Sequence, residues 1–420
     1  MKKLSVITIL WCMSVCIMSA QNIDVAQAQK NAEEFLNNMD RHLPLTQVET
    51  ASMRARTRGE EAKDYYYVFN VGNKEGFVIA SADNRTSSVL GYALKGSFNL
   101  DDMPENVAAW LRCYEDQIAY IQKNNLQPTS TRSAPAIHPA VPDLLKTKWS
   151  QKSPYYNDCP LWKGQHCLTG CVSTSMAQVM YYYQYPKETT VSIPGYYTKT
   201  HHIKVSALPA TTFVWSKIRE EYTYGSAEEK EAVAHLMIYC STAIRADFTP
   251  TNTSAYYREQ KKALIEYFGY SNKLSVIFRP GFDDTTWDNF IYDEIANLRP
   301  VIYSGQVDDK EDSEGHSFVL HGYDGKGYYA VNWGWGGDYD GYYMLHLKSP
   351  ANNNIFNQFA MIRIMPDNSE NPETNIHGIA KDTQQMKAYD LSGRQINRNV
   401  KNKLVIMREA DGSTKKIYTK

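Results

Sequence analysis

Apolar and polar positions follow a pattern that predicts one compact unit near the start of the chain. Apolar residues recur at helical spacing from Val25 to Met39. Two strand-like stretches follow, Tyr65–Val71 and Gly76–Ala82, separated by a turn that contains glycine and asparagine. Because helical and strand patterns mix in this stretch, we expect an α+β unit over residues 21–125.

A second helix is the clearest element of this unit. Asp102 can cap its start, and Pro104 suits its first turn. Its apolar side chains share one face at the spacing of an amphipathic helix, and they are Val107, Trp110, Leu111, Tyr114, Ile118 and Ile121.

The composition changes after this helix. Between Lys123 and Asp143 the only formally charged residue is Arg132, and prolines interrupt a stretch rich in Ser, Thr and Ala. Such a stretch is typical of a linker, which we place at residues 126–142. An accessible linker between two folded parts is also what a zymogen needs, and Arg132 is a candidate cleavage point.

Two further regions follow the linker. Residues 143–366 form the largest block, and Tyr, Trp and Gly become frequent towards its end. Within residues 367–420, a polar stretch leads into weakly alternating segments with turn signals at Ser392–Gly393 and Asp411–Gly412. This alternation predicts a small β tail.

Residues 1–20 have the composition of a secretory signal peptide. Lys2 and Lys3 precede an apolar run from Leu4 to Met18, and Ala20 offers a cleavage site. The run is shorter than the ~20 residues that span a bilayer, and no second run of that kind follows. We therefore expect export without a transmembrane segment. Lipidation of Cys16 is an alternative, although the residues before it match a lipoprotein signal poorly.

Composition and charge exclude several classes of protein. Hydrophobic residues make up 43% of the chain and charged residues 22%, which is ordinary for a globular protein with a sizeable core. The 45 basic residues are balanced by 46 acidic ones, so the net charge is -1. The chain thus has no overall field that would attract nucleic acid, and we expect no nucleic-acid partner.

The first chemical signal is a cysteine at a predicted helix start. Apolar side chains recur at helical spacing over residues 172–183, Gly170 interrupts the chain before them, and Tyr185–Pro186 ends the pattern. Cys171 therefore lies at a helix N-terminus, where free backbone N–H groups and the helix dipole favour a thiolate. A cysteine in that position is more often structural, so the signal needs a partner.

His316 is the candidate partner. Two strand-like stretches flank a turn signal at Asp324–Gly325, which predicts a β-hairpin. A two-residue turn places Asn332 opposite Ser317, and a slip of one position places it opposite His316. Facing residues lie ~5 Å apart, so either register lets the Asn332 amide orient the imidazole. His321 is offset by an odd number of positions and is expected to point to the other face.

Two further features complete the candidate site. Gln151, upstream of the cysteine, can join the backbone N–H of Cys171 in an oxyanion hole. Trp333 and Trp335 lie among glycines directly after Asn332, where they can shield a polar pair. A Cys–His pair with an orienting Asn is the arrangement of papain-like nucleophilic catalysis.

Together these residues resemble the streptopain family of secreted, papain-like cysteine peptidases, which are made as zymogens. The matching motifs are Trp149-Ser150-Gln151, Thr169-Gly170-Cys171-Val172, Gly315-His316-Ser317-Phe318-Val319 and Val331-Asn332-Trp333-Gly334-Trp335-Gly336-Gly337. Residues 21–125 resemble the inhibitory pro-domain of the family more loosely. The resemblance implies a papain-like, two-lobed α+β peptidase over residues 143–366.

The resemblance also implies a role for each candidate residue. Cys171 would be the nucleophile, and His316 its general base and acid. Asn332 would orient the ring, Gln151 would help to form the oxyanion hole, and Trp333 would cover the contact between His316 and Asn332.

Substrate binding would use main-chain atoms at Gly315 and a serine in the middle of the domain, for which Ser254 is the candidate. No metal and no organic cofactor is expected.

The chain departs from the family pattern at a few positions. Ser173 and Ser175 stand where alanines are often seen after the nucleophile. Cys159 and Cys167 are additional, and they can close a small disulfide beside the nucleophile. A zinc site is the rival interpretation, although no paired C-x₂-C spacing supports it; its ligands would be Cys159, His166, Cys167 and Cys171.

We therefore expect a secreted cysteine endopeptidase that cleaves protein or peptide substrates and has its own pro-domain as intramolecular inhibitor. A Cys–His amidase acting on cell-wall peptides is one alternative, and an inactive peptidase scaffold used for binding or adhesion is another. Residues 388–396 resemble the start of the C-terminal sorting domains read by the type IX secretion route. Export to the cell surface by that route is one interpretation of the tail, and a plain all-β appendage is the other.

Overall fold

The computed structural model describes most of the chain as two separate units. The units are Met1–Asn375 and Ile376–Lys420. The described residues are 22–49, 64–126, 138–306, 315–347, 358–367 and the strands of the tail. The predicted signal segment, Arg132 and most of the predicted linker lie outside them.

The N-terminal part combines a helix with four antiparallel strands; the sequence pattern predicts the helix, β2 and β3, but not β1 and β4. Helix α1 (Val25–Asn37) begins at Asp24, whose carboxylate accepts a hydrogen bond from the Gln27 amide. It packs against the sheet through Ala28, Ala32 and Leu36. The strands are β1 (Leu45–Val48), β2 (Tyr66–Val71), β3 (Phe77–Ser81) and β4 (Val89–Ala93).

Helix α3 (Glu105–Lys123) buries every residue of the predicted apolar face, which confirms that face. The predicted cap is wrong. Pro104 is the N-cap residue and no side chain caps the helix, while the Asp102 carboxylate accepts a hydrogen bond from the Asn99 side chain at 3.2 Å. The fixed backbone of proline takes the position that the sequence pattern assigns to an aspartate.

The longest elements of the next part of the chain, up to residue 266, are helices. Helix α5 has a full capping box, because Ser226 and Glu229 exchange side-chain to backbone hydrogen bonds. The elements of this part are β5 (Leu161–Trp162), β6 (Gln165–His166), α4 (Cys171–Tyr183), β7 (Tyr196–Tyr197), β8 (Lys204–Val205), the 3-10 turn η1 (Trp215–Lys217), α5 (Ala227–Ala243) and α6 (Tyr257–Glu266).

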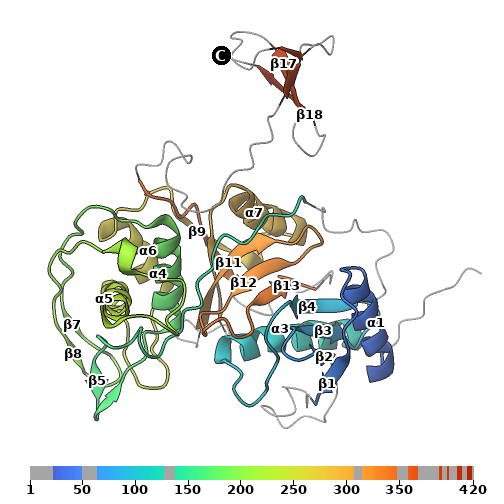
Figure 1. Ribbon diagram of the computed structural model, residues 1–420, viewed down its shortest axis with the longest axis horizontal. Coiled ribbons are helices and arrows are strands. Elements are labelled where there is room, and N and C mark those ends of the chain that lie inside the picture. Colours follow the sequence, from blue (N-terminus) through green and yellow to red (C-terminus); the bar gives the residue numbers. More distant parts are fainter. Residues whose placement is uncertain are drawn as a thin grey trace, which may run out of the picture. The chain divides into compact units, whose positions relative to one another are not determined.

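The last part of the first unit returns to strands. Its elements are β9 (Ser275–Phe278), the 3-10 turn η2 (Arg279–Gly281), α7 (Asp284–Ala296), β10 (Val301–Gln306), β11 (Gly315–Tyr323), β12 (Tyr329–Asn332), β13 (Gly341–Tyr343) and β14 (Phe359–Ile362). In Figure 1 the helices α4, α5 and α6 gather on one side of these strands, and β1–β4 lie on the other. The α+β class predicted from the sequence is confirmed.

One sheet joins the N-terminal part to the rest of the unit. Its strand order is β1-β2-β3-β4-β13-β12-β11-β10-β14-β9. The junction is the antiparallel pair of β4 with β13, in which Tyr92 lies opposite Tyr342 and Gly91 opposite Tyr343. A side chain added at Gly91 would come within 2.8 Å of the Tyr343 ring, so the junction requires a residue without Cβ. The two parts therefore share one hydrogen-bonded core.

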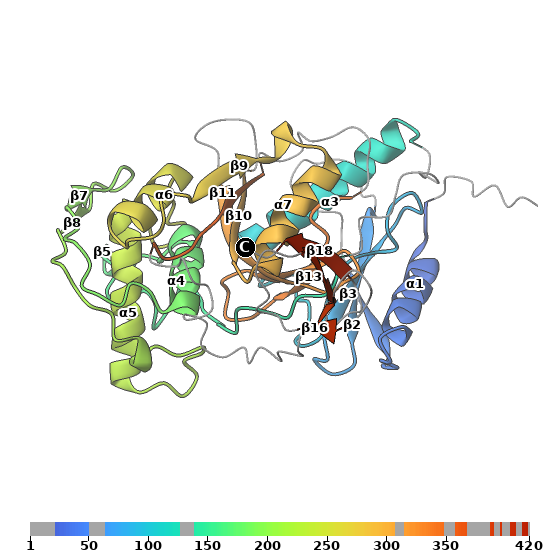
Figure 2. The ribbon, with the colours of Figure 1, turned by 90° about the horizontal axis from the view of Figure 1, so that it is seen from above.

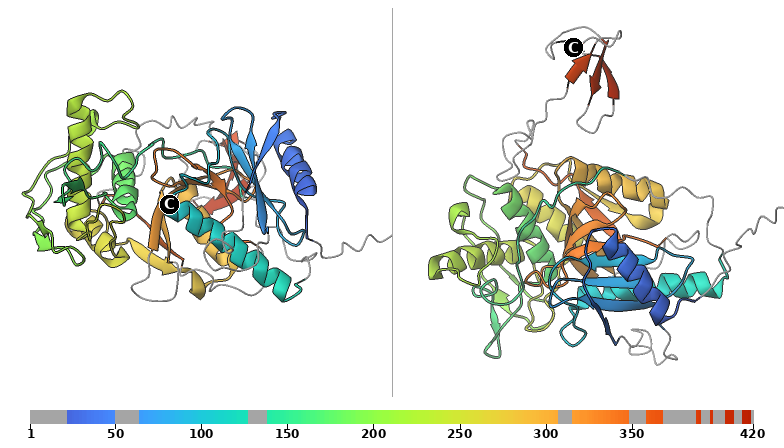
Figure 3. Two further views of the ribbon diagram at one scale, coloured as in Figure 1. Left: turned by 90° about the horizontal axis from the view of Figure 1, so that it is seen from below. Right: turned by 45° about the vertical axis from the view of Figure 1, so that its right-hand side comes forward.

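Helices cover the two faces of the β10–β11 part of the sheet. On one face, Trp110 of α3 packs against Tyr303 and Phe318, and Trp287 of α7 donates a hydrogen bond to the Tyr303 hydroxyl. On the other face, α4 packs along β11. Figures 2 and 3 show the long helix α3 running across the sheet strands. Helices α4 and α3 thus enclose β11 from opposite sides.

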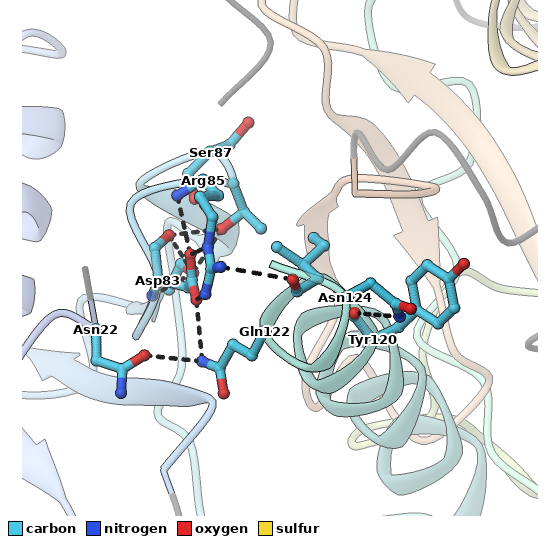
Figure 4. Close-up of polar contacts among 10 residues, drawn as sticks. Asn22, Asp83, Arg85, Ser87, Tyr120, Gln122 and Asn124 are labelled. Carbon is cyan, nitrogen blue, oxygen red and sulfur yellow. Dashed lines mark hydrogen bonds and ion pairs between the residues drawn. The ribbon is translucent and has the colours of Figure 1, made fainter. Parts of the chain in front are cut away.

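A buried ion pair holds the end of α3 to the β3–β4 connection (Figure 4). Arg85 binds both carboxylate oxygens of Asp83, and the Gln122 amide donates to Asp83 at 3.0 Å and to Asn22 at 3.2 Å. Burial alone would raise the pKa of Asp83, but the hydrogen bonds from Arg85 and Gln122 outweigh it and lower that pKa. Asp83 therefore stays ionised and fixes the helix terminus that precedes the predicted linker.

The second unit is a small antiparallel sheet with the order β16-β15-β17-β18. Its strands are β15 (Lys387–Tyr389), β16 (Gln395–Ile396), β17 (Leu404–Arg408) and β18 (Thr414–Tyr418). Both predicted turns fall between paired strands, as expected for a β tail. Within the part of the chain that the structure describes, no helix is both long and apolar enough to cross a bilayer.

Candidate active site

Cys171 is the first residue of helix α4, as the sequence predicts. The N-cap residue, Gly170, has a φ of 86°. A Cβ at Gly170 would lie 2.6 Å from the carbonyl oxygen of Thr253, so both backbone conformation and space require glycine there. This turn aims the free N–H groups of the first helical turn at the cysteine, and those groups favour a thiolate.

A cavity of about 660 Å³ brings three of the predicted site residues together. Cys171 reaches it from α4, His316 from β11, and Gln151 from the segment before α4. Gln151 is 5% exposed, and its carbonyl oxygen accepts a hydrogen bond from the Thr169 amide. The cavity therefore contains the thiol, the imidazole and the amide that the proposed chemistry needs.

The predicted pairing of Asn332 with His316 is wrong in both registers. Asn332 lies opposite Val319, three positions further along β11 than His316. The connection between the strands has five residues rather than two, because Tyr323 pairs with Tyr329. The Asp324 carboxylate accepts hydrogen bonds from two backbone amides inside this loop and so stabilises the longer turn.

The Asn332 amide is bound to backbone groups away from His316. Its nitrogen donates to the carbonyl oxygen of Thr147 at 2.6 Å, and its oxygen accepts from the Gly334 amide at 3.1 Å. In this form of the protein, Asn332 holds the loop that follows β12 and does not orient the imidazole.

The tryptophan that lines the cavity is Trp335, whereas Trp333 was predicted to cover the histidine. Trp333 is 1% exposed, packs against Phe318 and donates its indole hydrogen bond to the Tyr339 carbonyl. Both tryptophans belong to the glycine-rich sequence motif that identifies this loop. The motif alone cannot decide between them, because their burial depends on the packing of α3.

The predicted substrate-binding residues do not line the cavity. Ser254 is exposed and forms a backbone bridge with Asp247, and Gly315 is exposed at the start of β11. The neighbouring segment 251–253 does line the cavity, together with Leu168. His321 does not line the cavity; it is buried, and its ring accepts a hydrogen bond from the Leu145 amide.

The N-terminal part closes one side of the cavity. Residues 101–106, which lead into α3, are part of its lining. The Asn106 side chain donates to the Trp333 carbonyl at 2.9 Å and accepts from the Trp335 indole at 3.0 Å. Asn106 is 2% exposed, so these bonds are shielded from water. The start of α3 is therefore fastened to the loop beside the histidine.

Charges and burial in this form oppose a thiolate–imidazolium pair. Burial raises the pKa of the Cys171 thiol, and the nearby carboxylate of Glu105 raises it further. Burial, and to a smaller extent the guanidinium of Arg112, lower the pKa of His316 to about 4. Both charged residues belong to α3. With α3 in place, the thiol and the imidazole are both neutral near pH 7.

The other described cysteines are buried free thiols, including Cys159 and Cys167. The disulfide considered from the sequence is not formed in this structure. No group of three or more His, Cys, Asp or Glu side chains suited to a metal occurs among the described residues. The geometry therefore does not support the rival zinc interpretation, whose ligands would include Cys171.

A cysteine at a helix start, a histidine across the cavity and an N-terminal unit that closes it define a cysteine peptidase with an inhibitory pro-domain. The chain belongs to the streptopain family, peptidase family C10. The family model of peptidase C10 matches residues 149–343, and that of the Spi protease inhibitor matches residues 20–118.

Relatives and a solved structure agree with this assignment. Streptopain of Streptococcus pyogenes is 32% identical over 313 residues, which cover 70% of this chain and 77% of streptopain. The thiol protease/hemagglutinin PrtT of Porphyromonas gingivalis is 30% identical over 356 residues, which cover 80% of this chain but only 40% of PrtT. A prointerpain A fragment from Prevotella intermedia matches with a TM-score of 0.64 at 28% identity, over 76% of this chain and 98% of the fragment.

Proposed function

We propose that this cysteine peptidase is an exported endopeptidase in which Cys171 is the nucleophile and His316 the general base and acid. The observation that carries the proposal is their shared cavity, in which the thiol stands at a helix N-terminus and Gln151 lies beside it. The substrate is a protein or peptide, because a peptide carbonyl is the electrophile that this set of groups is suited to.

The reaction begins once the pro-domain has left the cavity. A proton moves from the thiol to the His316 imidazole, and the thiolate attacks the peptide carbonyl carbon. The backbone N–H of Cys171 and the side-chain amide of Gln151 stabilise the resulting oxyanion. His316 then protonates the leaving amine as the C–N bond breaks, and a water molecule, deprotonated by His316, hydrolyses the acyl-enzyme.

The contacts between the pro-domain and the cavity account for the latency of the precursor. Residues 101–106 occupy one wall of the cavity, and α3 supplies charges that disfavour both members of the ion pair. Cleavage within residues 126–142 would release this part without cutting the catalytic part. We assign export to residues 1–20. For the tail, a secretion assay distinguishes a sorting domain from a plain appendage.

The oxyanion role of Gln151 predicts a loss of turnover without a loss of binding. Gln151→Ala in the matured enzyme should lower kcat by about 10²–10³-fold with little change in KM, because one donor to the oxyanion is removed. Steady-state kinetics on casein-derived peptides measure this. Lys152→Ala, at the next position in the cavity wall, is the control and should keep kcat within about threefold of the parent. An unchanged kcat in Gln151→Ala would remove the residue from the mechanism.

The electrostatic account of latency predicts different thiol reactivity before and after maturation. At pH 6–7 the Cys171 thiol of the precursor should react with iodoacetamide about 100-fold more slowly than that of the mature enzyme, because its raised pKa keeps it protonated. The rate in the precursor should rise steadily with pH, because the thiolate fraction grows as the pH approaches the raised pKa of its thiol, while the mature enzyme should react across the whole range.

A short labelling pulse followed by separation of the precursor and mature bands measures both rates in one sample. Equal labelling of Cys171 in the two bands at pH 6 would show that the pro-domain does not suppress the thiolate.

A substrate panel separates the proposed peptidase from the cell-wall amidase. The matured enzyme should cleave casein and leave muropeptides intact. Cleavage of muropeptides alone would replace the protein substrate in this proposal while keeping the nucleophile.

A further inference from the structure

Two buried serine hydroxyls connect the nucleophile helix to the histidine strand. The Oγ atoms of Ser175 on α4 and Ser317 on β11 lie 2.9 Å apart, and the two residues are 1% and 2% exposed. Ser175 is four positions after Cys171, so it lies on the same face of the helix. Ser317 directly follows His316. The bridge therefore joins the two elements that carry the reactive groups.

The surrounding contacts extend the bridge into a small network. Ser175 Oγ also lies 3.0 Å from the Val172 carbonyl oxygen, to which it can donate. Gln260 of α6 donates to the same carbonyl at 3.1 Å and lies 3.4 Å from Ser175 Oγ. The bridge is therefore tied to the first turn of α4 and to α6.

The backbone of Ser317 also lies near the reactive sulfur. The Ser317 backbone amide lowers the pKa of the Cys171 thiol, against the larger effect of burial. Ser175 lies one helical turn after Cys171, and Ser317 directly follows His316, so the bridge joins the two sides of the site. A displacement of Ser317 would change the position of His316 and the surroundings of the Cys171 sulfur.

We propose that Ser175 and Ser317 are positioning residues of the peptidase, which set the spacing between the nucleophile helix and the histidine strand. The inference rests on the proposed roles of Cys171 and His316. All members of the network belong to the catalytic part, so the bridge does not depend on the pro-domain.

The chain offers a matched control on the same helix. Ser173 is 0% exposed, and its Oγ accepts a hydrogen bond from Ser241 of α5 at 2.9 Å. This hydrogen bond goes to α5 rather than to β11, so its loss perturbs the packing of α4 without breaking the bridge to the histidine strand. Ser173→Ala separates positioning from general helix packing.

The test compares pH profiles of matured Ser175→Ala, Ser317→Ala, the double variant and Ser173→Ala. The double variant removes both hydroxyls, so neither is left buried without its partner. Its unfolding temperature should therefore lie within a few degrees of that of the parent. In the double variant we expect the acidic limb of the pH profile of kcat/KM to move to higher pH by about 0.5–1 unit. We expect kcat to fall by about 5–20-fold, while KM stays within about twofold of the parental value. Each single variant should show the same shift as the double variant, because removing either hydroxyl breaks the same hydrogen bond.

Two results would overturn the proposal. One is a parental pH profile in the double variant, and the other is an equal shift in Ser173→Ala. Neither result touches the proposed function, which fails separately if Cys171→Ala keeps peptidase activity.

Discussion

Cys171→Ala should abolish peptidase activity and self-maturation together. Removal of a catalytic nucleophile typically lowers kcat by about 10⁶-fold. The precursor should remain at full length after export, since no acyl-enzyme can form. Because the side chain is small and partly exposed at the helix start, the fold should be retained. Casein cleavage and the length of the purified chain measure the two effects.

A second cysteine variant controls for the loss of a thiol. Cys240 is 0% exposed on α5 and packs against the sulfur of Met180. Cys240→Ala should lower stability by about 1 kcal/mol but keep specific activity within about threefold. Full activity in Cys171→Ala, or equal losses in both variants, would contradict the assignment of the nucleophile.

Trp110→Ala should release the pro-domain and speed maturation. The indole is 4% exposed and contacts Tyr303, Phe318 and Trp333 of the catalytic part. Replacing a buried tryptophan by alanine costs about 3–5 kcal/mol. That free energy is lost from the contact between α3 and the sheet, so the cavity should open more often. The rate at which the mature form appears measures the effect.

The matched control is an aromatic residue outside any interface. Tyr224 is 94% exposed, so Tyr224→Ala should mature at the parental rate. The Trp110→Ala change should also be made in the Cys171→Ala background, where thermal unfolding reports the loss of docking without proteolysis. Parental unfolding and parental maturation in Trp110→Ala would show that α3 is not held by this contact.

The local elements of the fold could be predicted from the sequence because each rests on neighbouring residues. The apolar face of α3 is encoded at helical spacing, and all its members are buried. Gly170 before Cys171 marks a helix start that the structure confirms. The family resemblance implies that Cys171, His316 and Gln151 come together, and the structure places all three at one cavity.

The parts that sequence patterns missed depend on contacts between distant segments. The hairpin register fails because Asp324 stabilises a five-residue turn through its own amide contacts, which a two-residue Asp-Gly signal does not reveal. Trp333 is buried because Trp110 of another domain packs on it, which leaves Trp335 at the cavity. The pairing of β4 with β13 could not be predicted from the sequence of either strand alone.

The shared sheet explains why the pro-domain holds the site so closely. The Met344 amide donates to the Leu90 carbonyl at 3.0 Å, and the Tyr114 hydroxyl lies within hydrogen-bond distance of both carbonyls, 2.9 Å from Leu90 and 2.7 Å from Met344. These backbone contacts fix α3 across β11, and the start of α3 then lies in the cavity. Latency here is a consequence of strand pairing as much as of the residues that fill the site.

The most direct test of the central claim is covalent labelling of the matured enzyme with a peptidyl epoxide, followed by peptide mass spectrometry. We predict one label per molecule, on Cys171, that forms in step with the loss of casein cleavage. The precursor and His316→Ala should label far more slowly. Loss of activity without a label on Cys171, or labelling of another cysteine, would contradict the account.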